Sequence, residues 1–351
     1  MKLHRVTPRP PLDWLAGMVL CHDVQLDGGR LRKGHVLGEG DVPTLPTAAA
    51  PELHVIELEA GDLHEDDAGR RVAAASAGEG VEVRAPSGGH WPLVATRRGV
   101  VAVSVDALRR ANAIDGVCVY TLFDGQIVDA GEHLGRAKVT PLVIAGRVVD
   151  EAERIAREAA GLLRVRPFLA RRVGAVVQET LGQGASARFR TALGEKVAWF
   201  GSTLLEPAFV APDEDALVSA IADVVAKGAE VLVVAGAKAM DPLDPSWLAL
   251  RRLGVTIERF GVPAHPGSLF WIAWHHGLPI LGMPTCGLFS QATVFDLVLP
   301  RVLAGERVGR AELAELGHGG FLTRELAFRF PPYRGSGRAR SRTTAPLDRP
   351  Q

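Results

Sequence analysis

The sequence predicts an α/β protein, in which a β-rich α+β N-terminal region precedes a C-terminal three-layer α/β/α domain with a mostly parallel sheet. The chain has 351 residues, which is enough for two domains. Hydrophobic residues make up 47% but aromatic residues only 6%, so we expect a core of Val, Leu, Ile and Ala. After residue 165, strand-like apolar segments alternate regularly with helical stripes, which is typical of a parallel sheet covered by helices.

The N-terminal region consists of short apolar segments separated by glycine. Their length and β-branched content predict strands at residues 18–24, 53–58, 81–84, 100–105, 117–122 and 139–144. Asp62 and Glu65 form a D-x-x-E capping pattern, which predicts a helix over residues 62–75. Apolar residues at helical spacing predict a second helix over residues 149–163.

The C-terminal part carries continuous apolar runs, which are expected of strands buried on both faces. These runs predict strands at residues 172–177, 204–210, 230–235, 256–260 and 279–282. Helical stripes between them predict helices, the last of them over residues 290–303. Pro245 directly follows Asp244, which is the form of an N-cap followed by proline at the first helical position.

Changes in composition divide the chain into four parts. We expect the β-rich α+β region over residues 1–165, the α/β domain over 166–310, an extension over 311–333 and a disordered tail over 334–351. The tail is rich in Gly, Ser, Pro and Arg and has almost no apolar residues. Residues 164–167 are expected to join the two domains, because the residue before a proline disfavours helix.

Charge and motif content exclude several classes of function. Lys and Arg together number 40, as do Asp and Glu, so no global positive field recruits nucleic acid or an anionic membrane. No apolar run has the roughly 18 residues of a membrane span, and the first residues lack the apolar segment of a secretory signal. The three cysteines form no CxxC pair, which favours reduced thiols. We therefore expect a cytoplasmic protein with neither a membrane nor a nucleic-acid partner.

Ligands of open α/β sheets collect at the carboxyl ends of the strands, and three predicted strand ends carry unusual residues. The first strand runs on through Glu179 and Thr180 to Gly182 and Gly184, and leads into a helix expected near Ser186. Its glycines allow close approach, and the free N–H groups at the helix start favour an anion. An ordinary βα loop is the alternative interpretation.

The second strand end carries small, basic and acidic residues in close succession. Gly236 and Ala237 let backbone amides approach a ligand, and Lys238 can neutralise a phosphate. Asp241 and Asp244 can hold a magnesium ion through water. The alternatives are an N-cap role for Asp244, a turn role for Asp241 and a solvent-exposed Lys238.

The third strand end is a Pro/Gly turn followed by a helix start. Pro284, Thr285 and Gly287 form the turn, and Ser290 lies where the helix is expected to begin. The arrangement predicts another anion cradle. Cys286 is either a reactive thiol near this helix terminus or a small half-buried residue.

Together these strand ends resemble the molybdopterin-binding domain shared by molybdopterin molybdotransferases (MoeA-type) and molybdopterin adenylyltransferases (MogA-type). Residues 233–244, VVAGAKAMDPLD, are similar to the family's T-G-G-x-S-x-G-D-x-D loop. Residues 262–267, VPAHPG, are similar to its V-x-x-x-P-G turn. Residues 279–287, PILGMPTCG, with Ser290 are similar to its P-V-x-G-L-P-G-N-P-x-S segment. The resemblance covers residues 168–306.

The resemblance implies a molybdopterin-binding fold, with molybdopterin or molybdenum cofactor as ligand and a role in cofactor biosynthesis. It implies that Asp241 and Asp244 are the catalytic and magnesium-binding residues. The residues that it assigns to the cofactor are Glu179, Thr180, Gly182, Gly184, Gly236, Ala237, Lys238, Pro266, Gly267, Pro284, Thr285, Cys286, Gly287 and Ser290.

The N-terminal region is similar to the companion region of a group of molybdopterin-binding proteins that are sometimes fused to a MobA-like nucleotidyltransferase. The residues that carry this resemblance lie at 17–20, 31–35 and 61–67. The resemblance implies a nucleotidyltransferase or an apo-molybdoenzyme as partner, and relatives with this fold are often homo-oligomers.

Two functions stay open at this point. A molybdotransferase-like enzyme would insert molybdate into adenylylated molybdopterin with the help of magnesium. A non-catalytic carrier would hold the cofactor and hand it to a nucleotidyltransferase or an apo-molybdoenzyme. The carrier is favoured by departures from the enzymes' motifs: Gln178, Glu179 and Thr180 stand where T-G-D-E is usual, and Thr285 and Cys286 replace Gly-Asn.

Overall fold

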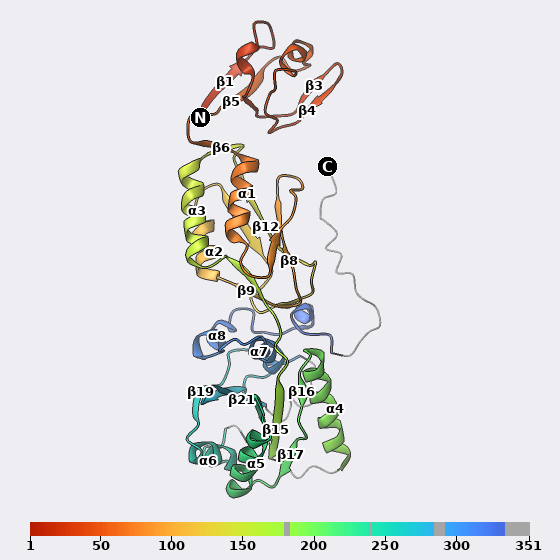
Figure 1. The fold of residues 1–351 in the computed structure, drawn as a ribbon, viewed down its shortest axis with the longest axis vertical. Coiled ribbons are helices and arrows are strands. Elements are labelled where there is room, and N and C mark those ends of the chain that lie inside the picture. The colour runs from red at the N-terminus through yellow and green to blue at the C-terminus, as the bar shows by residue number, and fades with distance from the viewer. Residues whose placement is uncertain (179–182, 239, 284–291, 334–351) are drawn as a thin grey trace. The chain divides into compact units, whose positions relative to one another are not determined.

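The computed structural model describes residues 1–178, 183–238, 240–283 and 292–333. The chain forms two compact units, drawn in Figure 1. Unit 1 comprises Met1–Arg97, Val101–Asp124 and Asp129–Val165. Unit 2 comprises Arg98–Val100, Gly125–Val128 and Arg166–Gln351. No helix among the described residues is both long and apolar enough to cross a membrane.

Unit 2 is built on a mixed seven-stranded sheet. The strand order is β16-β15-β18-β21-β20-β19, and β17 also pairs with β15. The strands are β15 Arg172–Gln178, β16 Thr203–Leu204, β17 Ala208–Val210, β18 Val231–Ala235, β19 Thr256–Phe260, β20 Trp271–His275 and β21 Leu278–Met283. Strands β16, β17 and β18 run parallel to β15, and β21 runs parallel to β18. Only β20 is antiparallel to its neighbours, β19 and β21, so the predicted α/β class is confirmed.

The sheet is buried on both faces, as its continuous apolar strands predict. Val173, Ala175 and Val177 of β15 face one core, whereas Val176 faces the other. The first core packs against α4 and α7, and the second against α5 and α6. The helices of this unit are α4 Gln183–Trp199, α5 Glu214–Ala226, α6 Pro245–Arg252, α7 Val294–Leu303 and α8 Arg310–Glu315, with a 3-10 helix η4 at Arg324–Arg329.

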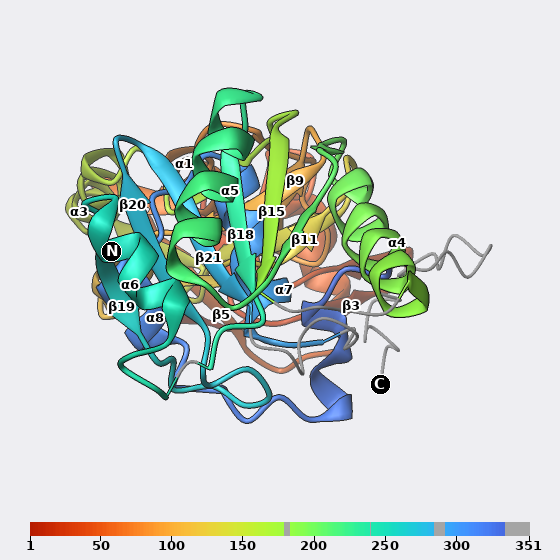
Figure 2. The ribbon, with the colours of Figure 1, turned by 90° about the horizontal axis from the view of Figure 1, so that it is seen from below.

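The figures show the resulting layers. Helices α4 and α5 lie on opposite sides of β15 in Figure 1. Viewed from below, α5 lies across β18 (Figure 2). The three-layer α/β/α arrangement predicted for this part of the chain is therefore present, because each face of the sheet carries helices.

Two strands of unit 2 differ from the prediction. Strand β20 was not predicted, although the His276-Gly277 pair that joins it to β21 has positive φ at both residues, 48° and 84°. Such a pair is typical of a two-residue hairpin turn. The single strand expected at 204–210 is split into β16 and β17, because Pro207 between them has no N–H to donate.

A buried ion pair joins two helices on one face of the sheet. Lys196 Nζ of α4 lies 2.6 Å from Asp296 Oδ1 of α7, and the two side chains are 6% and 0% exposed. The other oxygen, Asp296 Oδ2, accepts hydrogen bonds from the Thr293 N–H at 2.9 Å and the Thr293 hydroxyl at 3.0 Å. Burial raises the pKa of Asp296, and the neighbouring Lys196 charge opposes that effect. The first turn of α7 is thereby tied to α4.

The first part of unit 1 is a small β structure with its own core. It contains β1 Lys2–Val6, β2 Val19–Leu20, β3 Val24–Leu26, β4 Gly29–Leu31 and β5 Leu53–Glu57, with 3-10 helices at Asp13–Leu15 and Val42–Thr47. Strand β5 lies between β1 and β2, and β3 pairs with β4, all antiparallel. Fully buried leucines, among them Leu15, Leu20 and Leu53, form the centre of this core.

The rest of unit 1 is an α+β structure. Its strands are β6 Asp62–His64, β7 Val81–Val83, β8 Trp91–Ala95, β10 Val117–Thr121, β12 His133–Val139, β13 Val143–Ala145 and β14 Leu163–Arg166. Strands β10, β12, β8 and β7 form an antiparallel sheet in that order, and β13 pairs with β6. The helices are α1 Glu65–Ser76, α2 Val105–Asn112 and α3 Gly146–Glu158. Strand β9 (Gly99–Val103) begins in unit 2, where Gly99 and Val100 pair with β11 (Ile127–Val128), and its remaining residues belong to unit 1.

The three N-terminal segments that carry the resemblance meet in space. The Leu20 N–H donates to the His35 carbonyl at 3.0 Å, and the Gly34 N–H donates to the Leu20 carbonyl at 2.8 Å. His64 Nε2 donates to the Gly34 carbonyl at 2.8 Å, which leaves Nδ1 to accept the Asp66 N–H and cap α1. Residues 17–20, 31–35 and 61–67 thus form one hydrogen-bonded locus.

The start of α1 differs from the prediction. The helix begins at Glu65 rather than at residue 62, and His64 is the N-cap. The Asp62 carboxylate instead accepts the Glu59 N–H at 2.9 Å and pairs with the N-terminal ammonium group at 2.6 Å. Helix α2 was not predicted. The strand expected at 100–105 ends at Val103, and α2 begins two residues later, at Val105.

Helices α1 and α3 are clamped together by a buried carboxylate. The Glu153 side chain, 8% exposed, accepts a pair of 2.8 Å hydrogen bonds from Arg71 Nε and Nη2 and a 2.5 Å bond from Arg157 Nη2. Arg71 Nη2 also donates to Asp150 at 2.7 Å. The hydrogen bonds from Arg71 are the main reason that the pKa of Glu153 lies below its usual value.

This clamp makes stability depend on acid in a defined direction. Because the folded-state pKa of Glu153 lies below the unfolded value of about 4.3, its contribution is complete at higher pH and is lost as the pH falls through the folded value. We expect Glu153→Gln to lower the free energy of unfolding by about 1–3 kcal/mol near pH 7. The difference from the wild type should shrink below about pH 4.

Urea unfolding of both proteins from about pH 7 to about pH 3 measures this difference. Glu151→Gln is the matched control, because Glu151 also pairs with an arginine of α3 but is exposed, so its loss should cost less than about 0.5 kcal/mol. A wild-type to Glu153→Gln difference that stays constant over the whole pH range would contradict the clamp.

Candidate functional site

The ends of three parallel strands form the edge where a ligand site was predicted. Val177 of β15 pairs with Ala235 of β18, and Ala235 pairs with Met283 of β21. Because these strands are parallel neighbours, the segments that follow them leave the sheet at the same edge. The sheet topology therefore brings together the starts of all three candidate loops.

The segment after β18 runs against the end of β15. Gly236 has φ +86°, and a Cβ atom added to it would lie only 2.7 Å from the Gln178 carbonyl oxygen. Both the left-handed backbone and the close approach require glycine here. Gly236, which the resemblance assigned to the cofactor, is thus the point where this loop crosses the end of the neighbouring strand.

Asp244 holds the same loop from its other end. Its carboxylate is buried and accepts three hydrogen bonds, from Gln178 Nε2 at 3.0 Å, from the Lys238 N–H at 2.9 Å and from the Ser246 N–H at 2.9 Å. The Ser246 hydroxyl in turn donates to Gln178 Oε1. We call these four residues the Asp244 latch. It connects the end of β15, the loop after β18 and the start of α6.

The bond to Ser246 makes Asp244 the N-cap of α6, which was the alternative interpretation of this residue. Three N–H donors occupy much of the acceptor capacity of its two oxygens. The geometry therefore indicates that Asp244 positions the loop, whatever else binds there.

Asp241 and Lys238 are more open to solvent. Both residues are exposed, and the Asp241 N–H donates to the Lys238 carbonyl at 2.8 Å. Asp241 Oδ1 accepts the Leu243 N–H at 3.0 Å, which forms a turn within the loop. A carboxylate and an ammonium group thus lie on one short loop at the sheet edge. Ala237, between Gly236 and Lys238, is half-buried.

The Pro-Gly turn after β19 packs against the start of α7. The Pro266 carbonyl accepts the Val294 N–H at 3.2 Å. Gly267 has φ +108°, and a Cβ atom there would lie 2.8 Å from the Val294 nitrogen. The third candidate loop ends at this helix, so Pro266 and Gly267 contact the element that this loop leads into.

Several predicted residues lie outside the described residues. They are Glu179, Thr180, Gly182, Pro284, Thr285, Cys286, Gly287 and Ser290. Gly184 is described and is exposed in the first turn of α4. The structure therefore places Gly236, Ala237, Lys238, Asp241, Asp244, Pro266 and Gly267 at the ends of β18 and β19.

The prediction missed Gln178 and Ser246, the two side chains that complete the Asp244 latch. A signal was present, because Gln178 is a polar residue directly after the apolar run of β15 and is still 95% buried. A buried amide needs hydrogen-bond partners, and a partner was to be expected on the neighbouring loop.

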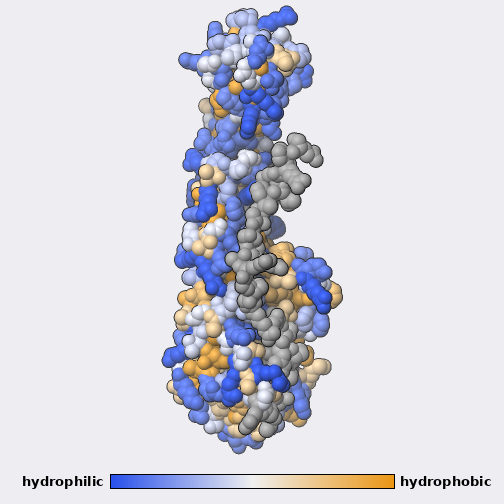
Figure 3. All heavy atoms as spheres, turned by 90° about the vertical axis from the view of Figure 1, so that its right-hand side faces the viewer, coloured by the Kyte–Doolittle hydropathy of each residue, from blue (hydrophilic) through white to orange (hydrophobic). Residues whose placement is uncertain are grey.

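The surface of the loop combines charge with exposed apolar side chains. Met240 and Leu243 are 81% and 73% exposed. Figure 3 shows hydrophobic and hydrophilic residues interspersed on the face of the protein that it displays. Within the described parts of the chain, no group of three or more His, Cys, Asp and Glu residues could hold a metal ion. A magnesium ion at Asp241 would need oxygen ligands from its substrate and from water.

Comparisons with known proteins bear on different parts of the chain. A family model described as a domain of unknown function, DUF8806, matches residues 15–57, which include most of the small N-terminal core. No curated protein matches the chain.

Solved structures that are similar to this chain include the following two. One is the molybdopterin biosynthesis MoeA protein from Pyrococcus horikosii, at 13% identity and a TM-score of 0.31, over 69% of this chain and 79% of that one. The other is the protein CinA with unknown function from Thermoplasma acidophilum, at 12% identity and a TM-score of 0.26, over 34% of this chain and 90% of that one. Both TM-scores are low, so the functional argument rests on this chain's own residues.

The close approach at Gly236 predicts a large effect of a small substitution. Gly236→Ala forces a side chain into a left-handed backbone and against the Gln178 carbonyl, so we expect it to lower the free energy of unfolding by about 2–4 kcal/mol. Gly201→Ala is the matched control, because Gly201 has φ +76° but open space around its Cβ position, and about 1–2 kcal/mol is expected. Chemical unfolding measures both. Equal losses would show that the loop does not press on β15.

Proposed function

We propose that the domain over residues 166–310 binds molybdopterin or molybdenum cofactor during cofactor biosynthesis. The observation that carries this proposal is the parallel pairing of β15, β18 and β21, because it brings the starts of the three candidate loops to one edge of one sheet. This edge is where open α/β sheets bind their ligands. In the proposal the pterin lies across the strand ends.

The loop after β18 supports recognition of the phosphate group of the pterin. Gly236 lets the loop pass close to the end of β15, and Lys238 offers an exposed ammonium group two residues later on the same loop. The Asp244 latch holds the Lys238 backbone at 2.9 Å, so the loop is ordered before a ligand arrives. Ordering before binding lowers the entropic cost of association.

Asp241 is the residue that fits a role with magnesium. It is exposed, and one of its oxygens accepts only a backbone N–H, whereas Asp244 is buried and accepts three hydrogen bonds. Mg²⁺ usually binds through one or two carboxylates together with phosphate oxygens and water. In this proposal Asp241 holds the ion beside the ligand phosphate and Asp244 keeps the loop in place.

Two activities use this site. The first is a molybdotransferase-like reaction, in which molybdate is inserted into adenylylated molybdopterin and AMP is released. The second is a carrier that hands the cofactor to a nucleotidyltransferase or an apo-molybdoenzyme without chemical change. The engagement of Asp244 in the latch favours the carrier, because it leaves Asp241 as the one exposed carboxylate of this loop.

Binding of purified molybdopterin to the full chain tests the site, with pterin fluorescence as the measurement. We expect Lys238→Gln to weaken binding of the phosphorylated pterin about 10-fold, because a charge-assisted hydrogen bond is lost. Binding of the dephosphorylated pterin should hardly change. Lys227→Gln is the matched control, because Lys227 is exposed at the C-terminal end of α5, before β18 begins.

If Lys238→Gln and wild-type protein had equal affinity for the phosphorylated pterin, the phosphate would not bind at this loop. Incubation with adenylylated molybdopterin, molybdate and magnesium separates the two activities. Release of AMP that is lost in Asp241→Asn supports the enzyme, whereas tight binding without AMP release supports the carrier. Failure to bind any pterin would refute both.

A further inference from the structure

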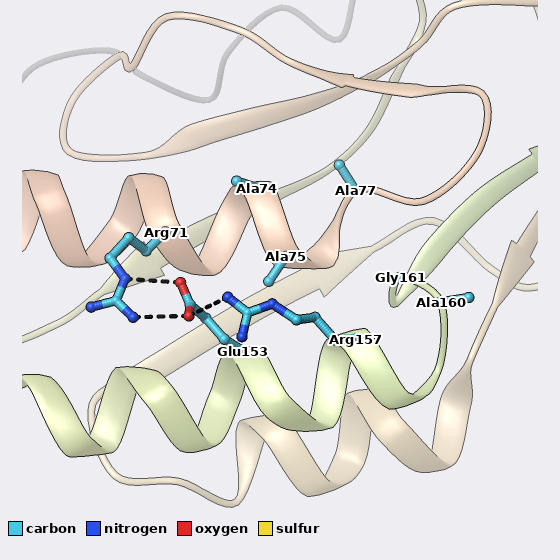
Figure 4. A pocket seen from close by; sticks show the side chains of 8 residues that line it. All are labelled: Arg71, Ala74, Ala75, Ala77, Glu153, Arg157, Ala160 and Gly161. Atoms are coloured by element: carbon cyan, nitrogen blue, oxygen red, sulfur yellow. Dashed lines mark hydrogen bonds and ion pairs between the residues drawn. The ribbon is translucent and has the colours of Figure 1, made fainter.

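A cavity of about 420 Å³ lies in unit 1, where the C-terminal halves of α1 and α3 meet (Figure 4). This volume is within the range of small-ligand pockets. Much of its wall is made of small residues from the two helix ends, namely Ala74, Ala75, Ala77, Ala160 and Gly161. The remaining lining residues are those of the Glu153 clamp. The role of unit 2 proposed above does not use this cavity.

The charged part of the wall holds two guanidinium groups and one carboxylate, and Arg71 is also paired with Asp150 at 2.7 Å, so Arg157 is the cation with donors to spare. Arg71, Arg157 and Glu153 line the cavity, and Glu153 is ionised because its pKa is lowered by its hydrogen bonds from Arg71. Glu153 accepts three hydrogen bonds, and only one of them comes from Arg157, through Nη2. A guanidinium group has five N–H donors, so Arg157 retains several. Its side chain is 67% exposed, which leaves them accessible.

Arg157 is not needed to cap the helix on which it lies. The Ala160 N–H donates to the Arg157 carbonyl at 2.9 Å, and the Gly161 N–H donates to the Ala156 carbonyl at 2.9 Å. Arg164 Nη1 donates to the Ala159 carbonyl at 2.5 Å. The carbonyls of Ala156, Arg157 and the C-cap residue Ala159 therefore have partners from the chain that follows the helix, and none of these bonds uses the Arg157 side chain.

The backbone at the cavity wall has a left-handed residue that carries a side chain. The two bonds at the end of α3 form a Schellman motif, whose left-handed residue is usually glycine. Here that residue is Ala160, with φ +53°. Retaining a side chain in this conformation is unfavourable, and strained residues of this kind cluster at functional sites. The methyl group of Ala160 belongs to the cavity wall.

We propose that this cavity binds a small organic anion. The Arg157 guanidinium holds its carboxylate or phosphate oxygens, since a guanidinium matches the planar, bidentate geometry of an oxyanion. The apolar part of the ligand packs against the alanine side chains. Glu153 keeps Arg157 in place by accepting a hydrogen bond from Arg157 Nη2. Figure 4 shows these two side chains between the helices.

Calorimetric titration of the full chain with benzoate tests the proposal, with benzylammonium and benzyl alcohol as cationic and neutral probes of similar size. We expect saturable binding of benzoate alone. Arg157→Gln should weaken it at least about 10-fold, because a charge-assisted bidentate contact is lost. Arg154→Gln should bind as the wild type does, because Arg154 lies on the same helix but is engaged by Glu151 and Glu158 outside the cavity.

The Ala160→Gly variant distinguishes an effect on ligand binding from an effect on the stability of the fold. Removing the methyl group relieves the strained backbone, so the melting temperature should rise by a few degrees while benzoate affinity falls several-fold. Unchanged benzoate binding in Arg157→Gln, equal binding of benzylammonium, or absence of saturation at about 10 mM benzoate would overturn the proposal.

Discussion

The hydrogen bonds accepted by the buried Asp244 carboxylate join parts of the C-terminal unit that the chain itself keeps far apart. One donor is Gln178 at the end of β15, another is the backbone of the loop after β18, and the third is the first turn of α6. A buried carboxylate is unfavourable unless its oxygens have partners, so these contacts are obligatory once the sheet has formed. The proposed site depends on them, because they fix the loop that carries Lys238 and Asp241.

A second buried carboxylate plays a comparable part in unit 1. Glu153 joins α1 to α3 through two arginines, much as Asp244 joins a strand end to a helix start. The two carboxylates differ in which charges and hydrogen-bond donors near them remain available to a ligand. Around Asp244 the donors are neutral, and the free charges lie on the loop that the latch orders. Around Glu153 the donors are cations, and one of them, Arg157, keeps most of its hydrogen-bonding capacity.

Much of the fold of unit 2 was predictable from the sequence, because strands buried on both faces are continuous apolar runs and helices have a different period. Strand β20 was missed since its signal lay in the His276-Gly277 turn and not in the strand. In unit 1, the capping pattern at Asp62 predicted the wrong helix start. The Asp62 carboxylate binds the Glu59 N–H and the N-terminal ammonium group instead of capping α1.

Only part of the candidate site was predictable from the sequence. Gly236 was singled out for approach to a ligand, which stays a prediction, whereas the structure shows that it lies against the Gln178 carbonyl. The N-cap alternative for Asp244 is confirmed. Gln178 and Ser246 were missed: the polar Gln178 after an apolar run indicated a buried amide, but its partners at the start of α6 follow only from the packed structure. The cavity between α1 and α3 was also beyond prediction, since it arises from the packing of two helices.

The location of the pterin site is the claim on which the proposed function depends. Hydrogen exchange of the full chain, recorded with and without purified molybdopterin, tests it most directly, because amides that a ligand contacts or orders exchange more slowly. The account predicts slower exchange in residues 236–244 and 262–267, with the amino ends of the same strands unaffected. Slower exchange confined to unit 1, or to the amino ends of β15 and β18, would contradict it.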